Sequence, residues 1–411
     1  MFNKLIFILV ITATITSCGV DSELKYKNRK KGNIEYIVKM YDHSEMNQLE
    51  QVNKIRSTAG LSLFSKDDKL EEAAINHSLY LVENKVAGHY ENSNNSKYTG
   101  YAPLDRTAYA GYNNSIVGEV VTNINGLPDV NSKKPLELLM SAIYHRLALL
   151  SFKYSNIGIG VATSKELSSY VYDLGMSQVV SYCDSDLDFK SGYVDVCLYN
   201  NKLLDSSIYD YNKINNEFMV VYPYDGQLDA DCVFYEEDPD PLPLCNVSGY
   251  PISISFNDSK VKSVELKDFT LLENGVSDVK EMTVLSNDND KKIDKNTYVF
   301  FPLKRLKYDT KYVAIVKYII QGLEYTHSWQ FKTKSVGYPV VNEMKTLLTD
   351  HVYVIYEEPN VCNNNYDYAV TRTDTIMLDF LDSDTIIIKP TKIEDNAIIK
   401  TNKKTYMFNI R

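Results

Sequence analysis

The sequence predicts an α+β protein in which a mixed helix and strand region is followed by an all-β region. Between residues 46 and 180, three segments repeat apolar residues at helical spacing and two segments alternate like strands. After about residue 215, short β-branched and aromatic segments are separated by turn residues, which is typical of an antiparallel sandwich. The chain has 411 residues, so two or three domains are expected.

The mixed region is expected to begin with helices. The second helix starts with a capping box, in which Ser65 and Asp68 satisfy backbone N–H groups of the first turn. The third carries Pro135 in its first turn, where proline is tolerated because the N–H groups of this turn have no partner within the helix. The expected helices span residues 46–60, 65–88 and 134–152, and the expected strands span residues 157–163 and 168–175.

The all-β region is expected to contain at least five strands. These strands cover residues 218–224, 250–256, 296–303, 311–320 and 327–333. The connection at 236–244 is rich in proline, which predicts a stiff extended linker or loop. Residues 336–411 keep strand-like runs but contain no motif that indicates a chemistry.

The N-terminus resembles an export signal. Lys4 precedes an apolar stretch, Leu5 to Ile11, that is too short to span a membrane. The small residues before Cys18 resemble the lipobox of bacterial lipoproteins, which implies cleavage before Cys18 and lipidation of that residue. An ordinary secretory signal is the alternative, and both place the mature chain outside the cytoplasm. The basic run at 24–31 would then contact anionic head groups or only solvate a tether.

The charge balance excludes one class of partner. The net charge is −10 and the sequence pI is about 5.2. A nucleic-acid-binding surface needs a concentrated basic face, and the only basic cluster is the run at 24–31. No nucleic-acid partner is therefore expected; the expected contacts are the membrane, through the N-terminal lipid, and an unknown small-molecule, peptide or envelope ligand.

The cysteines indicate a disulfide-forming compartment. In such a compartment Cys183 is expected to pair with Cys197, and Cys232 with Cys245, because each pair closes a short loop. Cys362 is left over as a buried thiol. A reducing envelope would leave all five as thiols.

These features divide the chain into five parts. They are a lipoprotein signal peptide (1–17), a tether (18–45), a mixed α and β domain (46–205), a linker with an all-β domain (216–335) and a β-rich C-terminal region (336–411).

Three polar residues stand where apolar or turn residues are expected. His89 follows the second helix, Glu119 lies between two β-branched pairs, and His145 lies inside the third helix. Two imidazoles and a carboxylate can hold a divalent transition metal such as zinc, with a position left for water. They can also form a hydrogen-bonded set in which the carboxylate fixes the tautomer of an imidazole. The spacing of the three residues alone does not decide between a metal site and a hydrogen-bonded set.

Six segments, in this order, resemble the CAP superfamily (cysteine-rich secretory proteins, antigen 5 and plant pathogenesis-related proteins), in its bacterial SCP-like branch. They lie between about residues 46 and 180 and read NKIRSTAGLSLF, AAINHSLYLVENKVAGH, TGYAPLDRTAYAGY, VGEVV, AIYHRLALL and IGIGVAT. The resemblance implies a CAP-type α-β-α sandwich around an antiparallel sheet. It also implies a central cleft with a His/Glu tetrad, which binds zinc through two histidines in some members.

The resemblance places His89, Glu119 and His145 in this cleft, with His89 and His145 as metal ligands and Glu119 as a possible third. The chain departs from the family pattern in three places. Leu139 stands where the third helix motif usually begins with tryptophan. Val120 stands where the family has asparagine, and the second glutamate of the animal and plant tetrad would fall near Ala142. A complete tetrad is therefore not expected.

Other polar residues near the cleft are expected to be structural. His77 lies on an apolar helix face and is predicted to be a hydrogen-bonded core histidine. Glu91 either supports the cleft or lies on a surface loop. Arg146 points away from the face of His145 and is expected to pair with a carboxylate such as Asp105.

Residues 248–334 resemble the bacterial Ig-like modules of surface proteins. The likeness is carried by a Leu-x-x-Asp-Thr-x-Tyr turn from Leu306 to Tyr312 and by a following aromatic-x-Phe-x-Thr strand. Such modules space or present a neighbouring domain.

Three functions follow from these observations. The first is a lipid-anchored envelope protein whose cleft binds a metal, an apolar molecule or a peptide without catalysis. The second is a metal-assisted hydrolase of peptides or envelope polymers, in which Glu119 accepts the proton of a metal-bound water. The third is a structural or adhesive surface protein. Binding is favoured over catalysis because the sequence contains no nucleophile elbow, phosphate loop or zinc-protease motif.

Overall fold

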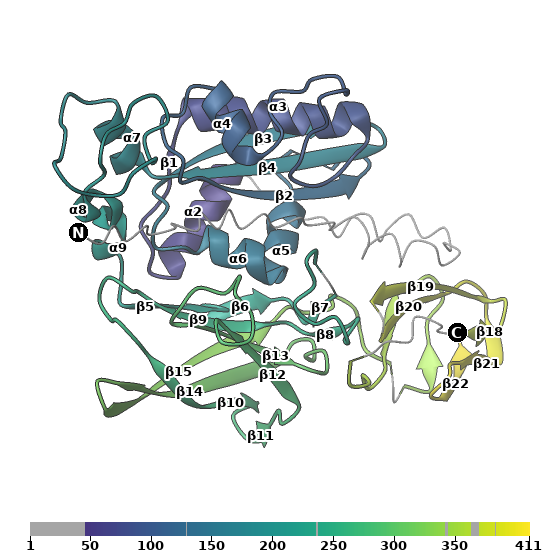
Figure 1. Cartoon of the computed structure of the whole chain (residues 1–411). Helices are drawn as coiled ribbons and strands as arrows, with labels where there is room; N and C mark the ends of the chain where they lie inside the picture. Colours follow the sequence, from purple (N-terminus) through teal and green to yellow (C-terminus); the bar gives the residue numbers. More distant parts are fainter. Residues whose placement is uncertain (1–45, 129, 236, 342–343, 363–369, 383) are drawn as a thin grey trace.

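The computed structural model describes residues 46–411 except 129, 236, 342–343, 363–369 and 383. The expected signal peptide and tether, with Cys18 and the basic run, lie outside the described residues. Within the described part of the chain, no helix is long and apolar enough to cross a membrane. We call its three parts the N-terminal module (46–214), the sandwich module (219–333) and the C-terminal module (346–410) (Figure 1).

The N-terminal module is a sheet between two layers of helices. The sheet order is β1-β3-β4-β2, with β1 parallel to β3 and the other pairs antiparallel. Helices α3 and α4 lie on one side of the sheet, and α2, α5 and α6 lie on the other, next to the sandwich module (Figure 1). The helices are α2 Gln48–Thr58, α3 Asp68–Asn84, α4 Pro103–Tyr109, α5 Lys134–Ser141, α6 Ile143–Leu149, α7 Ser177–Cys183, α8 Ser206–Tyr209 and α9 Tyr211–Ile214. The strands are β1 Ser65–Lys66, β2 Gly118–Asn125, β3 Asn156–Thr163 and β4 Leu167–Gly175.

Glycines in β3 allow α3 to pack closely on the sheet. Because side chains alternate along a strand, Gly158 and Gly160 share the face that meets α3. A Cβ atom at Gly158 would lie 2.0 Å from the backbone of Leu70, and one at Gly160 would lie 2.1 Å from the backbone of Ala74. Any larger residue at these positions would push the helix away from the sheet.

The predicted capping box at Ser65 is wrong. Ser65 belongs to the short strand β1, and its N–H donates to the carbonyl of Ser155 at 3.0 Å. The N-cap of α3 is Asp67, whose carboxylate accepts the backbone N–H groups of Lys69 and Leu70. The helix therefore begins later than the sequence pattern indicates, because pairing with β3 takes the residues before Asp67.

The single helix predicted at 134–152 is also wrong, because the chain breaks it at Ala142. This residue adopts an extended conformation (ψ 119°) between α5 and α6. The backbone N–H groups of Ile143 and Tyr144 donate to the carboxylate of Glu237 instead of continuing the helical ladder. A side chain from the sandwich module thus accepts the hydrogen bonds at the start of α6.

The all-β region predicted after residue 215 is confirmed. In the sandwich module, one sheet has the order β11-β10-β14-β15-β6 and the other has the order β12-β13-β9-β5. All neighbouring strands in these two sheets are antiparallel except β6 and β15. The strands are β5 Met219–Tyr222, β6 Gln227–Ala230, β7 Val233–Phe234, β8 Ser248–Gly249, β9 Ile252–Phe256, β10 Glu265–Glu273, β11 Ser277–Asp278, β12 Met282–Ser286, β13 Thr297–Pro302, β14 Lys311–Ile320 and β15 Leu323–Thr333.

The C-terminal module has two small sheets, β16-β22-β21-β18 and β17-β20-β19, around an apolar cluster of its own. Its strands are β16 Thr346–Leu347, β17 Tyr353–Tyr356, β18 Thr371–Arg372, β19 Ile376–Asp382, β20 Thr385–Pro390, β21 Glu394–Lys400 and β22 Thr405–Ile410.

The N-terminal and sandwich modules share a continuous apolar core. One cluster of buried side chains runs from Val52 and Leu139 of the N-terminal module to Tyr222 and Trp329 of the sandwich module. A second cluster packs Ile143 and Tyr144 of α6 against sandwich residues. Burial of apolar surface on this scale stabilises the contact between modules, so α6 is held at a tight interface rather than at an open surface.

The disulfides agree with the prediction in one case and correct it in the other. Cys183 pairs with Cys197 as predicted. The predicted Cys232–Cys245 pair is wrong, because Cys245 pairs with Cys362, which was expected to be a thiol. The thiol of Cys232 is buried and donates to the carbonyl of Lys307 at 3.7 Å. This disulfide therefore joins the C-terminal end of the expected linker to a residue 117 positions later in the chain.

Candidate functional site

The structure brings His89, Glu119 and His145 together in the interior. His89 lies in the loop after α3, Glu119 in β2 and His145 in α6, and all three are buried. Nδ1 of His89 lies 2.7 Å from Oε1 of Glu119. The rings of His89 and His145 stack, with centroids 6.4 Å apart and planes at 21°. Residues 56 positions apart in sequence thus meet at one place.

Arg106 joins this group from α4. Its Nη2 donates to Oε2 of Glu119 at 2.6 Å, and its Nη1 donates to the backbone carbonyl of His89 at 2.9 Å. Burial alone would raise the pKa of Glu119, but the Arg106 charge and the neighbouring imidazoles hold the pKa of this carboxyl well below its usual range. Glu119 is therefore an ionised acceptor. In the sequence, the only indication of Arg106 is its position inside TGYAPLDRTAYAGY, a segment that resembles the CAP family.

Glu237 pairs with His145 from the sandwich module. Its Oε2 lies 3.0 Å from Nδ1 of His145, and its Oε1 accepts the backbone N–H groups of Ile143 at 2.7 Å and Tyr144 at 3.1 Å. The carboxylate thus lies at the start of α6, beside Ala142, where the sequence lacks the second glutamate of the family tetrad. Sequence reasoning missed it because it is 92 residues from His145 in a segment predicted to be a linker.

These contacts fix the proton on each ring. The ionised Glu119 only accepts hydrogen bonds, so Nδ1 of His89 carries the proton, and Nδ1 of His145 faces a carboxylate oxygen of Glu237 in the same way. Burial lowers the pKa of His89, although the Glu119 charge opposes this, so the ring is neutral at pH 7. In a neutral ring with the proton on Nδ1, Nε2 is a lone pair, and neither Nε2 has a hydrogen-bond partner among the described residues.

Asp173 lies opposite Glu119 in the sheet. The two residues are register partners on β2 and β4, and both are buried. Burial, and then the negative charge of Glu119, raise the pKa of Asp173 well above its usual range. Asp173 is therefore a neutral acid beside an ionised one.

The remaining expectations near the site have mixed outcomes. His77 is a buried hydrogen-bonded histidine, as predicted, with contacts to Glu91 at 2.9 Å and to the carbonyl of Gly88 at 3.0 Å. Glu91 is buried, so its role is to support the loop rather than to lie on the surface. The predicted pairing of Arg146 with Asp105 is wrong.

Arg146 points into the module interface instead. Its guanidinium donates to the carbonyls of Met140 and Pro251, each at 2.6 Å, and lies over the rings of Tyr222 and Tyr250. Asp105 accepts the backbone N–H of Ala102, the residue before α4. Arg146 therefore stabilises the contact between modules.

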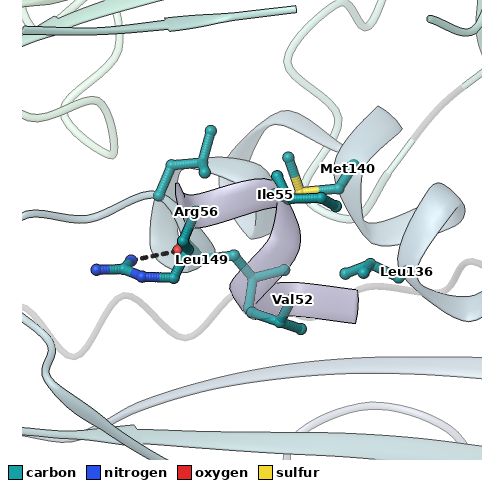
Figure 2. Close-up of a pocket in the computed structure, with 7 residues that line it drawn as sticks. Val52, Ile55, Arg56, Leu136, Met140 and Leu149 are labelled. Carbon is teal, nitrogen blue, oxygen red and sulfur yellow. Dashed lines mark hydrogen bonds between the residues drawn. The ribbon is translucent and has the colours of Figure 1, made fainter. Parts of the chain in front are cut away.

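A small apolar hollow lies beside α6. Figure 2 shows side chains of α2 and α5 around it, with Arg56 donating to the carbonyl of Leu149. The hollow has no room for a water molecule, so it is unsuited to an apolar ligand. A larger hollow of about 370 Å³ lies at the surface between α2 and β3, and its lining contains none of the three cleft residues.

The donor set limits what metal could be held. The described residues contain no cluster of three or more His, Cys, Asp or Glu side chains arranged around one point. Both oxygens of Glu119 are engaged by His89 and Arg106, so neither oxygen is free to bind a metal ion. The protein can therefore offer the Nε2 atoms of His89 and His145.

Comparison with known proteins gives one family match. The model of the Cysteine-rich secretory protein family (CAP) matches residues 49–184. No match was found among curated protein sequences.

Two solved bacterial structures are similar in part. An extracellular protein of Bacillus anthracis that contains an SCP domain is 20% identical over 31% of this chain, with a TM-score of 0.25, and the match spans 38% of that protein. An outer surface protein of Borrelia burgdorferi is 18% identical over 34% of this chain and 92% of its own length, with a TM-score of 0.26.

Proposed function

Because residues 49–184 form a CAP domain, we propose that this chain is a lipid-anchored envelope protein that binds a divalent metal ion, zinc foremost, through His89 and His145. The bound ion would lie in the interior, between the two imidazole rings. Catalysis is not part of the proposal.

The unpaired Nε2 atoms of His89 and His145 carry this proposal. A buried polar atom without a partner destabilises a protein by roughly 1–3 kcal/mol, so such atoms are rare unless they have a function. Here two of them belong to stacked rings. A shared cation would satisfy both at once.

The surroundings of the two rings suit zinc. Metal-binding histidines commonly donate their other N–H to a carboxylate, which fixes the tautomer and makes the ligand more basic. His89 does so to Glu119, and His145 does so to Glu237. With two protein ligands, the remaining positions of a tetrahedral ion would be filled by water or by groups of the ligand, which the ion would polarise.

The same contacts weigh against the hydrolase alternative. A general base must be free to accept a proton from water at the reacting centre. Glu119 has one oxygen on His89 and the other on Arg106, and its pKa is held low. It is better placed to orient His89 than to take a proton.

The expected location is supported by the covalent chemistry. Two disulfides, Cys183–Cys197 and Cys245–Cys362, indicate an oxidising compartment. The leader-like N-terminus and Cys18 supply the proposed route and anchor.

Metal binding is tested by zinc titration calorimetry and metal analysis on the chain from residue 19 onward. Wild type should bind one zinc ion, and His89→Ala and His145→Ala should each lose it. His351→Ala is the matched control, because this histidine is exposed and its only hydrogen bond among the described residues is to the carbonyl of Thr349. Equal zinc uptake by all four proteins would overturn the proposal.

A further inference from the structure

The segment predicted to be a linker between modules reaches the site instead. Glu237 follows β7 of the sandwich module, and its side chain is 1% exposed. Phe234 and Leu242, which flank it, belong to the same apolar cluster as Ile143 and Tyr144 of α6. Cys245 fixes the far end of the segment to Cys362. The position of Glu237 is therefore set by apolar packing on both sides and by a disulfide on its C-terminal side.

The carboxylate of Glu237 has a demanding set of partners. One oxygen accepts two backbone N–H groups, from Ile143 and Tyr144, and the other accepts Nδ1–H of His145. All three partners are donors, so the site requires two acceptor oxygens. Only a carboxylate offers them, because the amide of glutamine has one acceptor oxygen and one donor NH2 group.

We propose that Glu237 is a positioning residue that the sandwich module contributes to the site of the N-terminal module. It fixes His145 in the Nδ1–H tautomer and so leaves Nε2 as a lone pair inside the protein. The site is thus built from two modules, and a side chain of the sandwich module completes it. The tautomer is a property of the metal-free protein; only its consequence for zinc rests on the proposed function.

Glu237→Gln separates positioning from packing. The amide oxygen can keep the two backbone N–H bonds at the start of α6, so the fold is retained. The NH2 group then faces Nδ1 of His145, and two donors cannot share one hydrogen bond. The ring must transfer its proton to Nε2, which removes the lone pair. A residue that only filled space would not move this proton when replaced by its isostere.

The experiment is NMR of the metal-free chain from residue 19 onward, labelled in its histidine rings. The sequence has six histidines, so single His→Gln variants can assign the ring signals. Spectra are recorded at about pH 8, above the ordinary imidazole pKa of about 6.5. The ring ¹⁵N and Cδ2 shifts of His145 should report Nδ1–H in wild type and Nε2–H in Glu237→Gln. Zinc affinity should fall by about 10- to 100-fold in the variant.

Glu357→Gln is the matched control. Glu357 is also a buried glutamate, but it bonds Thr401 and Tyr406 in the C-terminal module. It should leave the His145 signals unchanged. An Nε2–H tautomer in wild type would overturn the proposal, even if the variant failed to fold, and so would an unchanged tautomer in a folded Glu237→Gln protein. A wild type that shows Nδ1–H but binds no zinc would overturn the proposed function alone.

Discussion

Arg106 and Glu119 form a buried ion pair whose closest atoms, Nη2 and Oε2, lie 2.6 Å apart. Neither side chain is more than 1% exposed. The same guanidinium donates to the carbonyl of His89, so one residue of α4 fixes both the carboxylate and the loop that carries the imidazole. The geometry of the site therefore depends on a residue that contacts neither Nε2 atom.

Replacing Arg106 by methionine is expected to lower the free energy of unfolding by about 3–5 kcal/mol. The apolar side chain fills the space but leaves the Glu119 charge buried with too few partners. Urea unfolding at pH 7 measures the change. Lys66→Met is the control, because Lys66 pairs with Glu71 at the surface and the loss should be close to undetectable. Equal effects of the two substitutions would contradict the conclusion that Arg106 is needed to compensate the buried charge of Glu119.

Asp173 predicts a pH dependence of stability with a definite sign. Its pKa in the folded protein is raised well above its usual range, so the unfolded chain releases this proton at lower pH than the folded one. Stability is therefore fully present below about pH 4 and is lost as pH rises toward the folded pKa. One such proton changes the free energy of unfolding by about 1.4 kcal/mol per pH unit within that window.

Asp173→Asn removes this titration. The difference in unfolding free energy between the variant and wild type should shift steadily in favour of the variant as pH rises above 4. Denaturant unfolding at several pH values gives the slope. Asp309→Asn is the matched control, because it removes an exposed carboxylate that pairs with Lys332 at the surface. A difference that does not vary with pH would mean that Asp173 is ionised in the folded protein.

Local sequence patterns predicted the elements that depend on local physics. The helix predicted at 46–60 and the strands predicted at 157–163 and 168–175 are found in the structure as α2, β3 and β4. The CAP resemblance, carried by the order of six short motifs, is confirmed by the family match to residues 49–184. The same resemblance predicts that His89, Glu119 and His145 lie together, as they do in the structure.

Contacts between distant segments account for what the sequence did not reveal. The helix break at Ala142 has no glycine or proline to mark it, because the side chain of Glu237 replaces the helical hydrogen bonds there. Cys245 seemed to have a natural partner in Cys232, yet the fold places Cys362 beside it. Such pairings depend on how the modules pack against each other, and the spacing of residues in the sequence does not indicate this packing.

The two disulfides are expected to differ in their contribution to stability. Cys183 and Cys197 are 14 residues apart, whereas Cys245 and Cys362 are 117 apart. If cross-links act mainly on the unfolded chain, the short loop contributes about 3 kcal/mol and the long one nearly 5 kcal/mol. Unfolding of the two double Cys→Ser variants should follow this order. Peptide mapping of the non-reduced protein checks the pairing, and a Cys232–Cys245 peptide would refute it.

Gly160→Ala tests how α3 is held against the sheet. An added Cβ would lie 2.1 Å from the backbone of Ala74, and backbone cannot move aside without shifting the helix. We expect a loss of about 3 kcal/mol in the free energy of unfolding. His77 lies in α3, and the loop that carries His89 comes directly after this helix. A displaced α3 should therefore lower the zinc affinity as well. Gly275→Ala is the control: it has nothing within 4 Å, and its φ of +72° predicts a loss of only about 1 kcal/mol. A Gly160→Ala protein as stable as this control would show that α3 lies farther from β3 than the structure has it.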